Sequence, residues 1–204
     1  MSDLAGIRGQ ANSSVVPTIV EPNTVRKNLK QELGIPKKSV VFGNLGGAMV
    51  FNLLQAKRVI ERILSKRPDI YFIFMGIEPL GWKFRHKNLK FIAPTIDPER
   101  RYAFINTCQA MIHARKQGEM GGGAVAEFSV SNKPIITSCT GKAGARSVLK
   151  DKAMVYYTDK DLYDMINNFD PAEMSKKNWD CYSKDRFPEP AINKFYEIFT
   201  KDFM

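Results

Sequence analysis

The sequence predicts an α/β fold: one doubly wound domain of about six parallel strands, with helices on both faces of the sheet. Short apolar segments rich in β-branched and aromatic residues recur along the 204 residues, as expected of buried strands. Segments with apolar residues at three- and four-residue spacing separate them, as expected of amphipathic helices. This alternation is typical of a parallel sheet, because each connection between parallel strands must cross over one face.

The first residues differ from the rest of the chain. Residues 1–14 are small and polar and show no periodicity, so we expect a loose N-terminal tail there. A single Rossmann-like domain is expected over residues 15–204. The tail lacks the apolar stretch of a secretory signal, which leads us to expect a cytoplasmic location.

The strands are predicted from compact apolar runs bounded by glycine, proline or polar residues. A short extended segment at 15–20 is expected at an edge, because Pro17 lacks the N–H group that a central strand needs. The six strands of the sheet are expected at 39–44, 69–76, 89–94, 110–114, 133–138 and 152–157.

The helices are predicted from apolar spacing and from capping residues. Asn23 and Gly34 suit the two ends of one helix, Asp97 with Pro98 opens another, and Thr158 caps a third. Aromatic residues recur at helical spacing near the C-terminus, which indicates core packing more often than a partner surface. The helices are expected at 23–34, 51–66, 97–108, 123–132, around 143–150, 158–169, 171–183 and 190–203.

Composition and charge argue against several classes of protein. The formal net charge of +10 is compatible with nucleic acid, an anionic membrane surface or a phosphorylated ligand. The basic residues are scattered and RNA-binding signatures are missing, so a nucleic-acid protein is not predicted. The three cysteines and two histidines lack metal-ligand spacing, so neither a zinc site nor a disulfide framework is expected. The glycines of GNLGGAM lack the dinucleotide-binding spacing, which argues against a nicotinamide enzyme.

Ligands of doubly wound folds bind beyond the carboxyl ends of the strands. One loop at that edge contains three glycines, Gly121–Gly123, directly before a predicted helix. Such glycines let an anion approach the unpaired N–H groups of the helix start, while Glu119 and Glu127 could accept hydrogen bonds from sugar hydroxyls. The alternative is a flexible turn between two solvated carboxylates. The rule selects the loops at 44–50, 76–82, 93–97, 114–123 and 138–146.

The stretch HARKQGEMGGGAVAEFSVSNKPIIT resembles the Glu-x7-Glu signature of retaining GT-B glycosyltransferases of the group 1 (family 4) type. The order of VVPTIV, LGIPKKSVVFGNLGG, PDIYFIFMG and LKFIAPT is similar to the lead-in and first three strands of their C-terminal, nucleotide-sugar-binding domain. The resemblance runs from about Val15 to about Phe169 and looks closest to versions in large viruses of eukaryotes and some bacteria. It implies a Rossmann-like domain, one half of a GT-B fold.

The resemblance assigns roles around the glycine-rich loop. Glu127 would hold the ribose hydroxyls of the donor, and Glu119, in the catalytic position, would face the transferred sugar. The backbone amides of Gly122, Gly123 and Ala124 would bind the distal phosphate. Transfer in this family needs no metal and no cofactor, because the helix dipole and basic side chains stabilise the leaving diphosphate.

The resemblance also places the base and the diphosphate. Ala93 and Pro94 would border the base. Asn44 and Gly46 lie where the family binds the diphosphate, but Asn44 stands in place of the usual arginine, and no lysine or arginine follows between Leu45 and Leu54. The usual Phe-Gly between the glutamates is Gly121-Gly122, so the loop departs from the family pattern.

Other basic residues are candidates for the missing charge. Arg115, Lys116, Lys142 and Arg146 follow strands at the binding edge, and ordinary surface positions are the alternative for each. His113 ends a strand beside the motif, where it either contacts sugar or phosphate or is structural. Trp82, Phe84 and Arg85 either cover a base or pack on their own domain, and His86 is expected to face solvent.

The leading hypothesis is a donor-binding domain for a nucleotide-diphosphate sugar. A GT-B enzyme has two such domains, and its acceptor, a glycan or another molecule, is bound mainly by the N-terminal one. The isolated domain is therefore expected to bind the donor without efficient transfer. The alternatives are a non-enzymatic interaction module and electrostatic binding to nucleic acid or anionic lipid. The sugar, base, acceptor and oligomeric state stay open.

Overall fold

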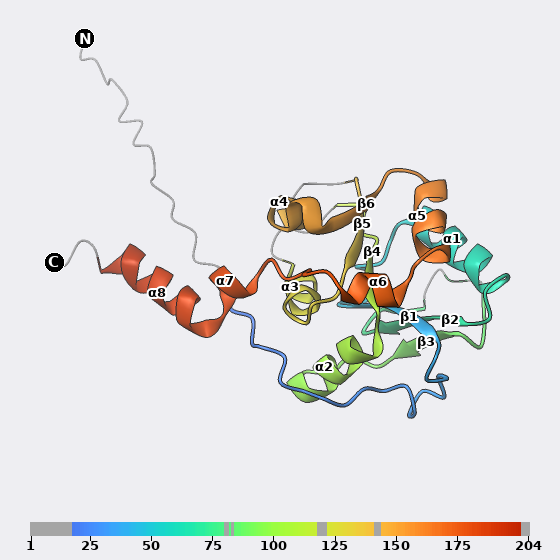
Figure 1. Cartoon of the computed structure of the whole chain (residues 1–204), viewed down its shortest axis with the longest axis horizontal. Coiled ribbons are helices and arrows are strands. Elements are labelled where there is room, and N and C mark those ends of the chain that lie inside the picture. Colours follow the sequence, from blue (N-terminus) through green and yellow to red (C-terminus); the bar gives the residue numbers. More distant parts are fainter. Residues whose placement is uncertain (1–17, 80–81, 83, 118–121, 141–143, 201–204) are drawn as a thin grey trace, which may run out of the picture.

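The computed structural model describes residues 18–79, 82, 84–117, 122–140 and 144–200. They form one six-stranded sheet of order β3-β2-β1-β4-β5-β6, in which all neighbouring strands are parallel (Figure 1). The predicted doubly wound α/β fold is thereby confirmed. The chain order reverses between β1 and β4, which makes this the switch point of the sheet. The strands are β1 Val40–Leu45, β2 Ile70–Met75, β3 Leu89–Ile92, β4 Ala110–His113, β5 Ile135–Ser138 and β6 Ala153–Tyr156.

Two helices, α2 Pro98–Thr107 and α5 Asp159–Asn167, start where their predicted caps place them. The Asp97 side chain accepts a 3.0 Å hydrogen bond from the N–H of Glu99, and Pro98 is the first residue of its helix. Thr158 and Asp161 form a reciprocal capping box. The helices are α1 Leu54–Leu64, α2 Pro98–Thr107, α3 Gly123–Val130, α4 Gly144–Leu149, the 3₁₀ turn η1 Lys150–Lys152, α5 Asp159–Asn167, α6 Pro171–Ser175, α7 Ser183–Arg186 and α8 Pro188–Phe199.

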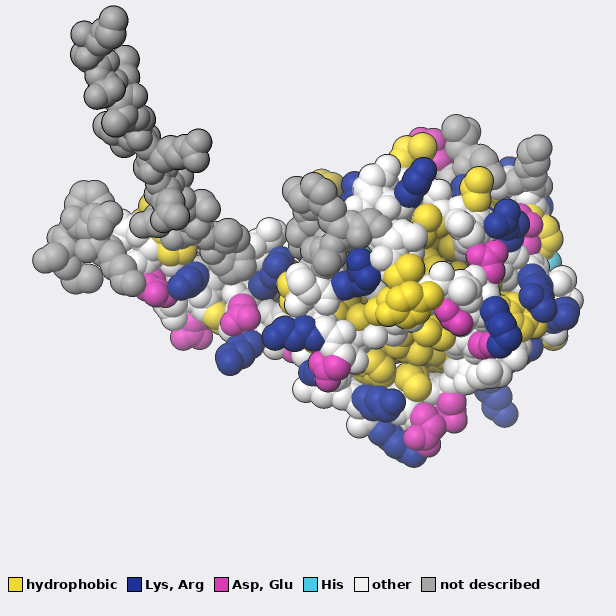
Figure 2. Space-filling model, turned by 90° about the horizontal axis from the view of Figure 1, so that it is seen from above, with side chains coloured by type: hydrophobic (Ala, Val, Ile, Leu, Met, Phe, Trp, Pro, Cys, Tyr) yellow, Lys and Arg dark blue, Asp and Glu magenta, His cyan; other side chains and the backbone are white. Residues whose placement is uncertain are grey.

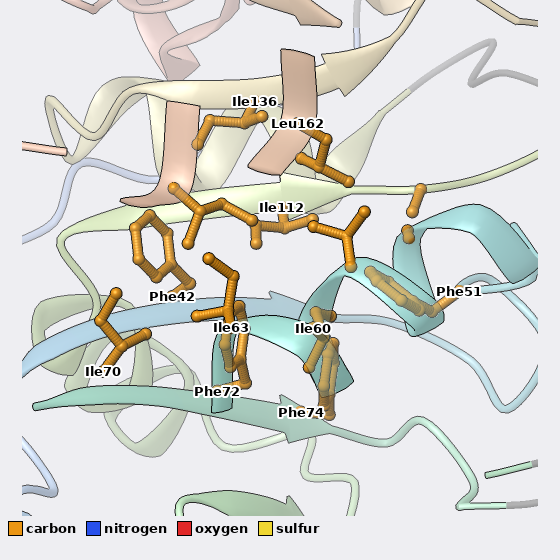
Figure 3. Close-up of a cluster of buried hydrophobic side chains, with 14 of the residues drawn as sticks. Phe42, Phe51, Ile60, Ile63, Ile70, Phe72, Phe74, Ile112, Ile136 and Leu162 are labelled. Atoms are coloured by element: carbon orange, nitrogen blue, oxygen red, sulfur yellow. The ribbon is translucent and has the colours of Figure 1, made fainter. Parts of the chain in front are cut away.

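Two apolar clusters, one on each face, hold the helices to the sheet. On one face α1 and α5 pack against alternate strand residues, with Ile60, Phe72, Ile112 and Leu162 in the same cluster (Figure 3). On the other face α2 and α3 cover a second buried set. The strands are buried on both faces, and this burial explains why their sequences are continuous runs of apolar residues. Among the described residues, no helix is long and apolar enough to span a bilayer.

The helix predicted at 23–34 is wrong, and residues 18–20 form no strand. The segment crosses α2 as irregular chain (Figure 1). Side chains of α2 satisfy its backbone: Asn106 donates to the carbonyls of Val25 and Lys27, and the N–H of Leu29 donates to Thr107. The backbone groups that a helix would pair internally are thus paired with a neighbouring helix.

The helix predicted at 171–183 is also wrong, because α6 ends at Ser175. The following residues lie on α3, where the hydroxyl of Ser129 donates to the carbonyl of Trp179 and accepts from the N–H of Cys181, at 3.0 and 2.9 Å. The N–H of Trp179 donates to Asn132 at 2.7 Å. Tertiary hydrogen bonds again replace those of a local helix.

Aromatic residues outside the strands divide into two groups. Trp82 is buried and packs on Phe51, Phe74 and Phe91, which confirms packing on its own domain. His86 is partly buried and stacks on Phe84, not free in solvent as predicted.

The C-terminal helix does not contribute aromatic residues to the core. Phe195, Tyr196 and Phe199 of α8 are exposed, and Phe195 packs against the other two. The prediction that they serve core packing is wrong, since α8 extends away from the sheet (Figure 1). Ala191 is the buried residue of this helix.

Candidate functional site

A small cavity lies at the carboxyl edge of the sheet, where doubly wound folds bind ligands. Its volume is about 200 Å³, and the ends of β1, β2 and β3 form its walls together with Arg101 of α2. Gly46, Gly76 and Pro94 are among the lining residues. Three of the five loops selected from the sequence contribute lining residues, those that begin at residues 44, 76 and 93.

The backbone at the bottom of this cavity is tightly built. Gly76 has a φ of +73°, a conformation that residues with a side chain rarely adopt. A Cβ atom at Gly76 would overlap the carbonyl oxygen of Gly46, whose own N–H donates to the carbonyl of Met75 at 3.1 Å. The ends of β1 and β2 therefore approach each other so closely that only glycine fits.

Two larger hollows lie away from this edge. They have volumes of about 870 and 740 Å³ and lie between α2 and the irregular segment that precedes β1. Polar side chains of the first hollow are engaged in the protein: Gln109 accepts from the N–H of Val41, and Lys30 donates to the carbonyls of Lys37 and Ser39. These groups hold the segment in place, so size alone does not make either hollow the functional site.

Glu127 lies on α3 and pairs with Arg101 of α2. A guanidinium nitrogen of Arg101 is 2.5 Å from Oε1 of Glu127, and the glutamate side chain is 17% exposed. The other oxygen, Oε2, is buried and has no hydrogen-bond partner among the residues that the structure describes. Burial raises the pKa of Glu127, and the positive charge of Arg101 opposes that rise.

The pKa of the neighbouring Tyr102 is affected by burial and by the negative charge of Glu127. Tyr102 follows Arg101 on α2, and its hydroxyl donates to the carbonyl of Glu21. Burial, followed by the negative charge of Glu127, raises the pKa of Tyr102 to about 12. Glu127 is thus a partly buried carboxylate with a cation on one side and, within the described ranges, no second hydrogen-bond donor.

The glycine-rich loop ends in the conformation that an anion site needs. Gly122 is the residue before α3 and is left-handed, with φ 59° and ψ 45°. No side chain of the described residues caps this helix start. A Cβ atom at Gly123 would meet no described residue within 4 Å. The unpaired N–H groups and the helix dipole favour negative charge here.

The predicted residues at the switch point are built into the sheet. Asn44 is buried, and its side-chain amide donates to the carbonyl of Ile112 at 2.6 Å, which links β1 to β4 beyond their last backbone pair. His113 is buried as well, and its Nδ1 lies 2.9 Å from the hydroxyl of Thr137 on β5. Both side chains lie at the correct edge, and both have partners within the protein.

The loop after β4 is tied to the start of α1. Asn52 accepts a 2.8 Å hydrogen bond from the N–H of Lys116, and its amide donates to Gln117 at 3.1 Å. Lys116 is exposed and Arg115 partly buried. Asn52 thereby holds these two basic residues near the edge without itself carrying a charge.

The remaining predicted positions are placed or lie outside the described residues. Ala93 and Pro94 are exposed directly after β3, and Pro94 lines the cavity. Glu119 and Lys142 lie outside the described residues. The sequence did not single out Arg101, although the signal was present: it occupies the first turn of a helix whose start follows a loop of the binding edge.

No protein-family model and no curated protein sequence matches the chain significantly. Solved structures do match. HepE from Anabaena, in complex with UDP and glucose, has a TM-score of 0.62 and 17% identity over 83% of this chain and 49% of that chain. WaaG, a glycosyltransferase involved in lipopolysaccharide biosynthesis, has a TM-score of 0.61 and 14% identity over 92% of this chain and 52% of that chain.

A third match is itself a single domain. The C-terminal domain of a group 1 family glycosyl transferase, LpcC from Francisella tularensis, has a TM-score of 0.56 and 16% identity over 90% of this chain and 96% of that chain. The chain therefore has the Rossmann-like fold of one half of a GT-B glycosyltransferase, and it spans about half the length of HepE and WaaG.

Proposed function

We propose that the chain is the nucleotide-sugar-binding domain of a retaining GT-B glycosyltransferase of the group 1 (family 4) type. The observation that carries the proposal is the position of Glu127: a partly buried carboxylate on the helix that begins at Gly123, beside the switch point of the sheet. The fold is similar to that of HepE, which was solved in complex with UDP-glucose.

Each part of a donor has a counterpart at this edge. The open N-terminus of α3 suits a phosphate, since its N–H groups lack a side-chain cap among the described residues. The carboxylate of Glu127 suits ribose hydroxyls, because an ionised carboxylate is purely an acceptor. Pro94 and the cavity beside it offer an apolar border for a base. Such a site binds its donor without a metal, and Glu119 would face the transferred sugar.

Isothermal titration calorimetry with UDP-, GDP- and ADP-sugars tests the proposal. We expect at least one donor to bind, and Glu127→Ala to weaken it by about tenfold or more, because hydrogen bonds to a charged group are worth about 1.5–3 kcal/mol. Glu173→Ala, an exposed glutamate of α6, is the matched control and should leave the affinity unchanged. Absence of binding by every donor, or equal affinity of Glu127→Ala, contradicts the proposal.

A second candidate function is a non-enzymatic interaction module with this fold. The buried amide of Asn44 and the lack of a basic residue from Leu45 to Leu54 favour it, because a leaving diphosphate needs positive charge close by. A turnover assay on the longest natural chain that contains this domain separates the two. Robust glycosyl transfer by that chain eliminates the module, whereas donor binding without transfer supports it.

A further inference from the structure

Arg101 has no part in the roles assigned so far, although it borders the site on two sides. Its side chain lines the cavity at the ends of β1, β2 and β3. It also reaches from α2 to α3, where it binds Oε1 of Glu127. The loop after β1, which is the other wall of the cavity, contains no basic residue. Arg101 therefore brings a positive charge to a cavity whose other lining residues carry none.

The pair has an unequal division of oxygens. Arg101 engages Oε1, while Oε2 is buried and has no partner within the described part of the chain. A buried acceptor without a donor is costly, so a hydroxyl that reached Oε2 would restore a hydrogen bond. Burial alone favours the neutral form of the carboxyl group, and the neighbouring guanidinium favours the charged form.

We propose that Arg101 is a positioning residue of the donor site: its guanidinium orients the side chain of Glu127 and balances its charge, so that the carboxylate accepts a ribose hydroxyl of a nucleoside diphosphate. The inference rests on the proposed function. It differs from a purely structural ion pair between α2 and α3, because a structural pair would affect stability without changing the protonation of a ligand-binding carboxylate.

The adjacent arginine supplies a matched control. Arg100 lies on the same helix and pairs with Glu32 at 2.6 Å, on the irregular segment that covers α2. Arg100 does not line the cavity. Arg100→Leu and Arg101→Leu each remove one positive charge and one ion pair from α2, and they differ only in whether the partner is Glu127.

The first measurement needs no ligand. Carbon-13 NMR of the labelled glutamate carboxyl groups, assigned with Glu127→Gln, follows the titration of Glu127 in the full chain. We expect its midpoint to move to higher pH in Arg101→Leu, to move back in Arg101→Lys, and to stay at the wild-type value in Arg100→Leu. An unchanged midpoint in Arg101→Leu overturns the proposal, whether or not nucleotides bind.

The second measurement is calorimetry with UDP, GDP and ADP between pH 5.5 and 8.5. We expect Arg101→Leu to weaken the best-bound nucleotide at least tenfold near pH 6, with a smaller loss at pH 8.5, and Arg101→Lys to recover part of it. Arg100→Leu should stay within twofold of wild type. An equal loss for both arginines, or a loss independent of pH, overturns the positioning role. Failure of the wild type to bind any nucleotide instead overturns the proposed function.

If Arg101→Leu does not fold, as judged by circular dichroism, Arg101→Lys and Arg101→Met carry the same test. Lysine keeps the charge but lacks the planar fork of the guanidinium, so it orients a carboxylate less well. We expect Arg101→Lys to keep the wild-type pH profile and Arg101→Met to shift it. Identical profiles for lysine and methionine contradict the proposal.

Discussion

A carboxylate in the position of Glu127 would bind a ligand at the expense of the stability of the fold. Burial raises the pKa of Glu127 above its unfolded value, and Arg101 offsets this only in part. Between the unfolded and folded pKa values the native state binds more protons than the unfolded state, so the free energy of unfolding falls as pH rises through this window. At pH 7 the ionised carboxylate is therefore less stabilising than a neutral group of the same shape.

Glu127→Gln tests this argument. We expect the variant to lose donor binding yet to gain stability relative to wild type as pH rises from 4 to 7.5, because the amide carries no charge to desolvate. Urea denaturation at several pH values measures the difference in the free energy of unfolding. A difference that stays constant with pH would show that Glu127 has an ordinary pKa.

Gly76 is the second residue with a specific consequence. Its φ of +73° and the adjacent carbonyl of Gly46 leave no space for a side chain. We expect Gly76→Ala to lower the free energy of unfolding by about 3 kcal/mol or more, since it combines left-handed strain with an atomic overlap against backbone. Urea denaturation provides the measurement.

Gly34→Ala is the control for that substitution. Gly34 also has a positive φ, of +61°, but a Cβ atom there would meet nothing within 4 Å. Gly34→Ala should therefore lower the free energy of unfolding only by the left-handed strain, about 1–2 kcal/mol. If the two alanine variants were equally stable, the close approach of the ends of β1 and β2 would have no energetic importance.

Residues differ in how far the sequence predicts their roles. The structure places Glu127, Gly122 and Pro94 on elements at the carboxyl edge of the sheet, as predicted from the strand order, and the roles that the resemblance implies for them stay predictions. The sequence indicated that Arg101 is near the binding edge, but its ion pair with Glu127 depends on α2 lying beside α3, which only the packed structure shows. The buried, hydrogen-bonded state of Asn44 was equally hidden.

At the scale of elements, α3 and the residue after its end hold a neighbouring segment through side-chain hydrogen bonds. The hydroxyl of Ser129 is fully buried and bonds both the carbonyl of Trp179 and the N–H of Cys181. Together with Asn132, it holds the segment between α6 and α7 against α3. This connection supports the same helix that carries Glu127.

Ser129→Ala measures the importance of that connection. We expect a loss of about 2–3 kcal/mol in the free energy of unfolding, since two buried backbone groups lose their partner. Ser65→Ala, an exposed serine that bonds a local carbonyl, should change stability by less than about 0.5 kcal/mol. Thermal or urea unfolding distinguishes them, and equal stabilities would mean that the backbone groups find other partners.

The elements that the sequence predicted wrongly share one cause. Helices with a buried apolar face and a clear cap, such as α2 and α5, were predicted within a few residues. Residues 23–34 and 176–182 have helical composition as well, but their backbone groups bond to side chains of α2 and α3 instead. Local propensity is a weak preference, and tertiary hydrogen bonds override it.

For the whole molecule, the parallel sheet followed from the alternation of strands and helices alone. The alternation indicates that each connection crosses a face, but it does not determine the strand order, which the structure shows to be β3-β2-β1-β4-β5-β6. The net charge predicted less about the molecule than this alternation did. Lysine and arginine side chains are spread among acidic ones on the face shown in Figure 2, without a continuous basic surface there.

The strand order also suits folding during synthesis. The first three strands to leave the ribosome, β1 to β3, pair with one another and can form half of the sheet on their own. β4, β5 and β6 then add to a single growing edge in the order of their translation. No strand has to be inserted between two that have already paired. Once β1, β2 and β3 have paired, β3 stays an outer edge of the sheet, and all further strands add at the opposite edge.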